Sequence, residues 1–116
     1  MFNLGSNIKI YLATGHTDMR KGFHKLAMLA STIVLSEKKE GALFVFRGRR
    51  SDRIKILWND GQGYCLYYKC LERGKFMWPT STTSKSIGIT KGQLAMLIEG
   101  IDWRMPKWSS APLYVG

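Results

Sequence analysis

The sequence has few of the residues that build metal sites, disulfide frameworks or membrane spans. It contains two cysteines and two histidines in 116 residues. Cys65 and Cys70 are five positions apart, a spacing that fits neither a C-x-x-C redox pair nor a zinc knuckle, so we expect reduced structural thiols. No run approaches the roughly 20 apolar residues that cross a bilayer, and the first residues lack the regions of a signal peptide. We therefore expect a cytoplasmic protein with no cofactor, no metal and no membrane contact.

Acidic residues are also scarce. Eight Asp and Glu stand against eighteen Lys and Arg, which leaves a formal charge of +10 on a small chain. A surface of this sign favours a polyanionic partner such as nucleic acid. Charge alone does not decide the matter, because a basic surface also keeps a small protein soluble.

The same scarcity argues against catalysis. A metal-dependent nuclease needs two or more carboxylates that converge on divalent cations, and no paired-acid motif is evident. His16 and His24 have no nearby nucleophile and no metal-ligand spacing. A glycine-rich phosphate loop that leads into a helix with a lysine is also missing. We predict that the protein is not an enzyme.

Length and composition predict one α+β domain over residues 1–116, with an irregular tail from about 104 to 116. The chain has 45% hydrophobic residues, enough for one core. Runs of β-forming residues, bounded by turn residues, predict strands at 8–13, 42–46, 54–58 and 64–71. The last three form an antiparallel meander. Residues 75–78 predict either a fourth meander strand or a short extended arm, ended by Pro79.

Two helices are predicted beside this sheet. Thr17 is placed to cap the first, with Asp18 in its first turn. Its apolar positions recur at three- and four-residue steps: Met19, Phe23, Leu26, Ala27, Ala30, Ile33 and Val34. The second begins after a capping box of Thr90 and Gln93 and ends at Gly100, following a Ser- and Thr-rich loop at 80–86. The predicted fold is thus an antiparallel sheet, the meander plus one or two further strands, packed against two helices.

Basic and aromatic residues are interleaved between positions 44 and 78, as on surfaces that neutralise phosphates and stack bases. Alternation along strands limits this inference, because Lys55 points away from Ile54, and Tyr64 and Tyr68 point away from Tyr67. About half of the aromatic rings must therefore belong to the core. The eight basic residues from 47 to 75 are Arg47, Arg49, Arg50, Arg53, Lys55, Lys69, Arg73 and Lys75.

A structural role explains the arginines of the turn less well than it explains the aromatic residues of the strands. Three guanidinium groups, Arg47, Arg49 and Arg50, surround one glycine and gain nothing in folding from mutual repulsion. A phosphate-contacting role is about as good an explanation as a solvated turn. Asp52 has a simpler explanation, as an ion-pair partner of a neighbouring arginine.

Four blocks of sequence in fixed order resemble one known family. The blocks Tyr11–Gly22, Leu43–Leu57, Leu71–Phe76 and Leu97–Trp103 resemble the TnpB-type accessory proteins of bacterial insertion sequences of family sixty-six. These are distinct from the RNA-guided nucleases that share the name. The resemblance spans roughly residues 8–104. The segment Trp58-Asn59-Asp60-Gly61 departs from the family's usual Tyr-Trp-Asp-Gly-like turn.

The resemblance implies a companion of a separately encoded DDE transposase, required or helpful for transposition and without a well-established activity of its own. The shared motifs place functional weight on polar residues in three of the blocks. These residues are Thr17, Asp18, Arg20, Lys21, Arg47, Arg49, Arg50, Asp52, Arg53, Lys55, Arg73 and Lys75.

Three hypotheses follow, and the oligomeric state stays open in all of them. In the first, the basic residues among those twelve bind DNA, chiefly through phosphates. In the second, the same surface docks an acidic patch of the transposase without touching DNA, since arginine pairs equally well with carboxylates. The third is a small metal-dependent nuclease that uses Asp18, Asp52 and Asp60.

Overall fold

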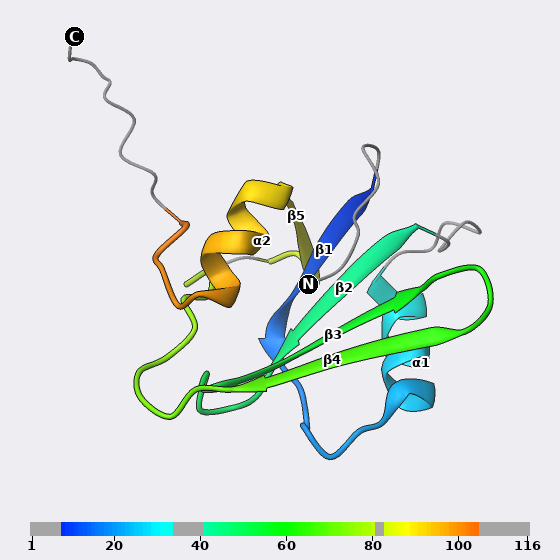
Figure 1. Cartoon of the computed structure of the whole chain (residues 1–116), viewed down its shortest axis with the longest axis horizontal. Helices are drawn as coiled ribbons and strands as arrows, with labels where there is room; N and C mark the ends of the chain where they lie inside the picture. The colour runs from blue at the N-terminus through cyan, green and yellow to red at the C-terminus, as the bar shows by residue number, and fades with distance from the viewer. Residues whose placement is uncertain (1–7, 34–40, 81–82, 105–116) are drawn as a thin grey trace, which may run out of the picture.

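The computed structural model describes residues 8–33, 41–80 and 83–104, which form a five-stranded sheet and two helices (Figure 1). The strand order across the sheet is β4-β3-β2-β1-β5. The elements are β1 (Lys9–His16), α1 (Phe23–Ile33), β2 (Ala42–Arg47), β3 (Arg53–Asn59), β4 (Tyr64–Cys70), β5 (Ser86–Ile89) and α2 (Lys91–Ile98). Neither helix in these ranges is long and apolar enough to cross a membrane.

The sheet is mixed, which corrects the prediction of an antiparallel one. The meander of β2, β3 and β4 is antiparallel as predicted, and β5 runs antiparallel to the other side of β1. However, β1 and β2 pair in parallel, with Ile10 opposite Leu43 and His16 opposite Arg47. The reason is α1, because a crossover helix returns the chain to the same end of the sheet. The α+β class is confirmed.

The two helices cover opposite faces of the sheet (Figure 1). On one face, Leu94 and Leu97 of α2 pack in a cluster with Val45. On the other face, Leu26 of α1 packs in a cluster with Phe44. Strand β2 is therefore buried on both sides. This explains why residues 42–46 form a continuous apolar run and not an alternating one.

Helix α1 begins at Phe23, five residues after the start predicted from a cap at Thr17. Thr17 is not its N-cap, and Asp18 is not in its first turn, because both residues belong to the loop before it. The backbone N–H of Thr17 donates to the carbonyl of Arg47 at 2.8 Å, so this residue is tied to the end of β2. Thr17 therefore makes a tertiary contact with β2 and does not cap the helix.

The start and the end of α2 are as predicted. Thr90 Oγ1 accepts from the Gln93 N–H at 3.0 Å, and Gln93 Oε1 accepts from the Thr90 N–H at 2.9 Å, which completes the capping box. Gly100, at φ 79°, takes the left-handed conformation that ends a helix. The loop predicted over 80–86 is wrong at its last residue, since Ser86 opens β5.

The segment after the meander forms no strand, which leaves the extended arm of the two predicted alternatives. Phe76 and Trp78 are buried in the α2-side cluster. The Trp78 indole N–H donates to the carbonyl of Ala13 at 2.8 Å, and Trp103 donates in the same way to Met77 at 2.9 Å. The arm is therefore part of the core. The predicted tail beyond Arg104 lies outside the described residues.

Candidate functional site

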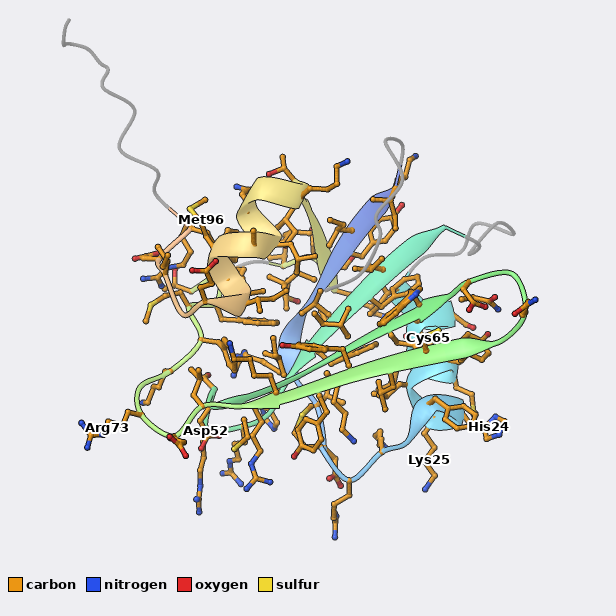
Figure 2. All side chains as sticks on the ribbon, viewed as in Figure 1. His24, Lys25, Asp52, Cys65, Arg73 and Met96 are labelled. Atoms are coloured by element: carbon orange, nitrogen blue, oxygen red, sulfur yellow. The ribbon has the colours of Figure 1, made fainter. Side chains whose placement is uncertain are left out.

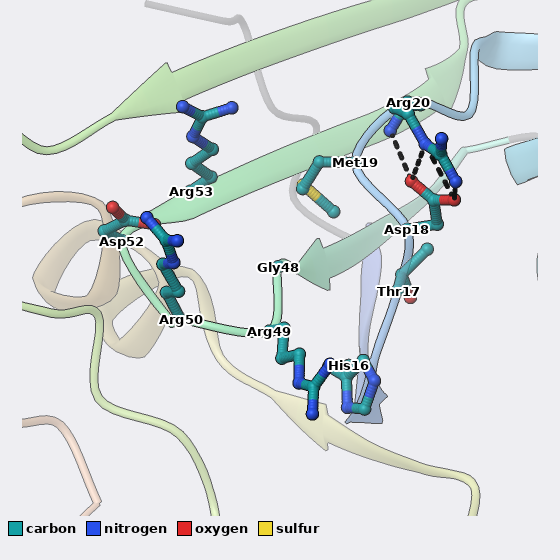
Figure 3. A pocket seen from close by; sticks show the side chains of 10 residues that line it. All are labelled: His16, Thr17, Asp18, Met19, Arg20, Gly48, Arg49, Arg50, Asp52 and Arg53. Atoms are coloured by element: carbon teal, nitrogen blue, oxygen red, sulfur yellow. Dashed lines mark hydrogen bonds and ion pairs between the residues drawn. The ribbon is translucent and has the colours of Figure 1, made fainter.

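Two loops that are distant in sequence meet at one end of the sheet and border an open hollow of about 610 Å³ (Figure 3). One loop follows β1 and the other follows β2. Because these strands are parallel neighbours, both loops leave the same end. We name this feature the arginine hollow. Its lining residues are His16, Thr17, Asp18, Met19, Arg20, Gly48, Arg49, Arg50, Asp52 and Arg53.

Backbone hydrogen bonds fix the loop that carries the arginines. The N–H of Gly48 donates to the carbonyl of Arg53 at 2.9 Å, and Ser51 donates to Gly48 at 3.0 Å. Ser51 adopts a left-handed conformation, with φ 63°. Non-glycine residues take this conformation where the surroundings hold it. The guanidinium groups therefore extend from a backbone of defined shape.

Four arginines line the hollow, against two aspartates. Arg49, Arg50 and Arg53 are exposed, and the Arg20 side chain is 91% exposed. Asp52 forms no ion pair with any described residue. The suggested pairing of Asp52 with a neighbouring arginine is therefore not seen. The hollow keeps an excess of uncompensated positive charge.

The one ion pair in the hollow joins Asp18 and Arg20, as the dashed lines of Figure 3 show. The Arg20 guanidinium donates to both carboxylate oxygens of Asp18 at 2.7 to 3.1 Å, and its backbone N–H donates at 2.9 Å. These bonds lower the pKa of Asp18 well below its ordinary value and raise the pKa of Arg20. Asp18 thus shapes the loop, and both of its carboxylate oxygens are bonded to Arg20.

Arg47 lies outside the hollow, although the sequence placed it among the binding residues. Its guanidinium lies 5.7 Å from the centre of the Trp78 ring and donates to Ser51 Oγ at 3.3 Å. Burial lowers its pKa, and its Nε has no hydrogen-bond partner among the described residues. These contacts brace the loop between β2 and β3, residues 48–52, against the arm that contains Trp78; we name this loop the arginine loop.

Lys55 also lies outside the hollow. Only 7% of it is exposed, and its ammonium donates to the carbonyl of Lys21 at 2.8 Å. Burial lowers its pKa. Lys21 is half-buried and does not line the hollow. The structure gives Lys55 a supporting role, since it ties the loop after β1 to the sheet.

A second basic loop, residues 71–75, adjoins the first. The N–H groups of Leu71 and Phe76 donate to the carbonyls of Asp52 and Ser51, at 2.8 and 2.6 Å. Arg73 and Lys75, between these anchor points, are exposed. Figure 2 shows Arg73 and Asp52 at the same end of the sheet, away from α1. The predicted residues of three sequence blocks thus gather at one end of the molecule.

Two residues of this region were not predicted from the sequence as site residues. His16 lines the hollow at the end of β1. Tyr68 is 48% exposed, and its hydroxyl accepts a hydrogen bond from Arg53 at 3.3 Å. Strand alternation was the available signal for Tyr68, because it places the ring on the same face as Arg53 and Lys55.

The three candidate acids of a nuclease do not come together. Asp18 and Asp52 line the hollow. Asp60 lies in the turn between β3 and β4, where it accepts from the N–H groups of Gln62 and Gly63 at 2.9 and 3.0 Å. Within residues 8–33, 41–80 and 83–104, no group of three or more His, Cys, Asp or Glu is placed to hold a metal ion.

Comparisons with known proteins point to a mobile-element family. Residues 8–108 match the family model described as "IS66 Orf2 like protein". The chain is 46% identical over 116 residues to the uncharacterized protein y4hO of Sinorhizobium fredii (strain NBRC 101917 / NGR234), with all of both chains covered. It is 32% identical over 107 residues to the uncharacterized protein y4jC of the same strain, covering 92% of this chain and 91% of y4jC. No solved structure matches the chain.

Proposed function

The chain belongs to the IS66 Orf2-like family of insertion-sequence accessory proteins, and from this premise we propose that it is a non-catalytic accessory factor that binds DNA. In this proposal the arginine hollow contacts the phosphate backbone during transposition of the element. A separately encoded DDE transposase is the second partner.

The observation that carries the proposal is the excess of exposed guanidinium groups on a fixed backbone. Arg49 and Arg50 have no carboxylate partner among the described residues. The planar, forked guanidinium matches phosphate oxygens in a bidentate geometry, and its charge releases counterions from DNA. A solvated turn needs no such density of positive charge.

The second basic loop supports the same function. Its backbone is bonded to the arginine loop at Asp52 and Ser51, so Arg73 and Lys75 keep a defined position beside the hollow. A phosphate backbone is an extended row of charges and requires an extended row of cations. The two loops together provide it.

The affinity for a short DNA duplex tests the proposal. The triple variant Arg49→Ala, Arg50→Ala, Arg53→Ala should bind on the order of tenfold more weakly at low salt. A matched control replaces three exposed lysines that do not line the hollow, Lys9, Lys25 and Lys85, with alanine. Both variants lose three charges. Equal affinities of the two variants would show that net charge, and not the hollow, is responsible.

The adaptor hypothesis makes a different prediction. If the guanidinium groups dock an acidic surface of the transposase, the complex should survive nuclease treatment and the triple variant should lose it. If DNA holds the two proteins together, a pull-down after nuclease digestion should recover no transposase. This experiment separates the two partners with the same set of variants.

A further inference from the structure

Tyr68 presents a large part of its ring to solvent beside the arginine hollow. It is 48% exposed on β4, whereas Leu66, two residues earlier on the same face, packs in the α1-side cluster. The ring thus lies on the part of the sheet that α1 leaves uncovered. An aromatic ring in this position offers an apolar surface next to cations.

Two contacts hold the ring in one orientation. Arg53 donates to its hydroxyl at 3.3 Å. The Lys55 ammonium lies 4.8 Å from the ring centre and is itself fixed by its bond to the carbonyl of Lys21. A ring fixed in this way loses little freedom when a flat partner stacks on it.

The register of the strands joins Tyr68 to the hollow. Tyr68 lies opposite Lys55, and Arg53, on the same face, lies opposite Cys70. Arg53 also lines the hollow. One side chain therefore touches the ring and the phosphate-binding surface. DNA whose phosphates contact Arg53 would bring neighbouring nucleotides within reach of Tyr68.

We propose that Tyr68 stacks on an unpaired nucleobase of DNA whose phosphates are held by Arg49, Arg50 and Arg53. The bases of an intact duplex are stacked on one another, so only an unpaired nucleotide can use the ring. The inference rests on the proposed function and adds to it a class of ligand: single-stranded DNA, as at a melted or cleaved end.

Tyr64 provides an internal control. It lies on the same strand and the same face, about 13 Å away at roughly 3.3 Å per residue, and it is 45% exposed. Tyr64 lines a small cavity between α1 and the sheet, together with Ala27 and Ala30 of α1 and Asn59 of β3. No arginine or lysine lines this cavity. Tyr64 matches Tyr68 in exposure and differs from it in charge environment.

The test compares two single strands of equal length, oligothymidylate and an abasic oligomer with the same phosphates. The protein should bind oligothymidylate about tenfold more tightly, the magnitude of one stacked base. Tyr68→Leu should bind both oligomers with the affinity of the abasic one, and Tyr68→Phe should keep most of the preference. Tyr64→Leu should behave like the parent protein. Circular dichroism and thermal melting confirm that each variant is folded.

The outcomes are distinct for the two proposals. If the parent protein binds both oligomers equally, or if Tyr68→Leu keeps the preference for oligothymidylate, stacking on Tyr68 is refuted while phosphate binding stands. If neither oligomer nor duplex DNA binds, both proposals fail. If Tyr64→Leu loses the preference as well, the effect is not specific to Tyr68 and the inference is wrong.

Discussion

Gly48 and Met19 lie in contact across the two loops of the arginine hollow, so that a Cβ atom on residue 48 would stand 2.8 Å from Met19 Cγ. Gly48 is the first residue after β2, and Met19 belongs to the loop after β1. The hollow therefore exists in its present shape because residue 48 has no side chain. This contact lets two distant segments act as one surface.

We expect Gly48→Ala to destabilise the protein by about 1–2 kcal/mol, since an added methyl group in a close contact forces its neighbours to shift. Urea denaturation measures the change. The double variant with Met19→Ala should recover part of the loss, because the clashing atom is gone. Equal costs in the two backgrounds would show that the Gly48 to Met19 contact is not the cause.

Asp18 should make stability depend on acid pH. Its hydrogen bonds with Arg20 lower its pKa in the folded state from the ordinary value of 3.8. The unfolded chain therefore takes up this proton first, and the stabilisation is present above the ordinary pKa and disappears as the pH falls below it. Urea denaturation between about pH 5 and pH 2 should show a shallower decline for Asp18→Asn than for the parent protein. Parallel curves would mean that the ion pair does not stabilise the fold.

Lys55 should also make stability rise with pH, but in the alkaline range. Burial lowers its pKa below the ordinary 10.5, so the unfolded chain binds the proton more tightly than the folded one. Stability should rise as the pH passes through the lowered pKa toward the ordinary one. Lys55→Met lacks this rise and, at neutral pH, leaves the Lys21 carbonyl without its donor, at a cost of about 1 kcal/mol. Urea denaturation at several alkaline pH values measures the difference in unfolding free energy between the parent protein and the variant. Taking this difference removes the contribution of the other groups that titrate at alkaline pH. A difference that does not change with pH would refute the assignment.

Local signals predicted the parts of the fold that depend on local chemistry. The capping box of Thr90 and Gln93 involves only residues three positions apart, and the meander follows from alternation and turns. Thr17 also looks like a cap locally. Its N–H is bonded instead to Arg47, thirty residues away, and such a contact leaves no trace in a local pattern.

The short strand β5 and the mixed sheet escaped prediction for the same reason. β5 has four residues, one of them Gly88, and it is a strand because the edge of β1 supplies its partners. The direction of β1 relative to β2 depends on where α1 returns the chain. Neither property is encoded within the segment concerned.

The sequence predicted residues of the candidate site in separate blocks of the chain, but not the single surface that they form. The segments around Asp18 and around Arg49 were both singled out, but only the parallel pairing of β1 and β2 shows that they meet. Lys55 was counted with the exposed cations. Alternation placed it correctly away from Ile54, yet the sequence could not show that the loop at Lys21 covers it.

The salt dependence of DNA binding tests the central claim most directly. The logarithm of the binding constant falls linearly with the logarithm of the salt concentration, with a slope of about 0.9 per phosphate contact on duplex DNA. If Arg49, Arg50 and Arg53 each contact a phosphate, their joint replacement by alanine should lower this slope by about 3, while replacement of Lys9, Lys25 and Lys85 leaves it unchanged. Identical slopes for the parent protein and the arginine variant would contradict DNA binding through the arginine hollow.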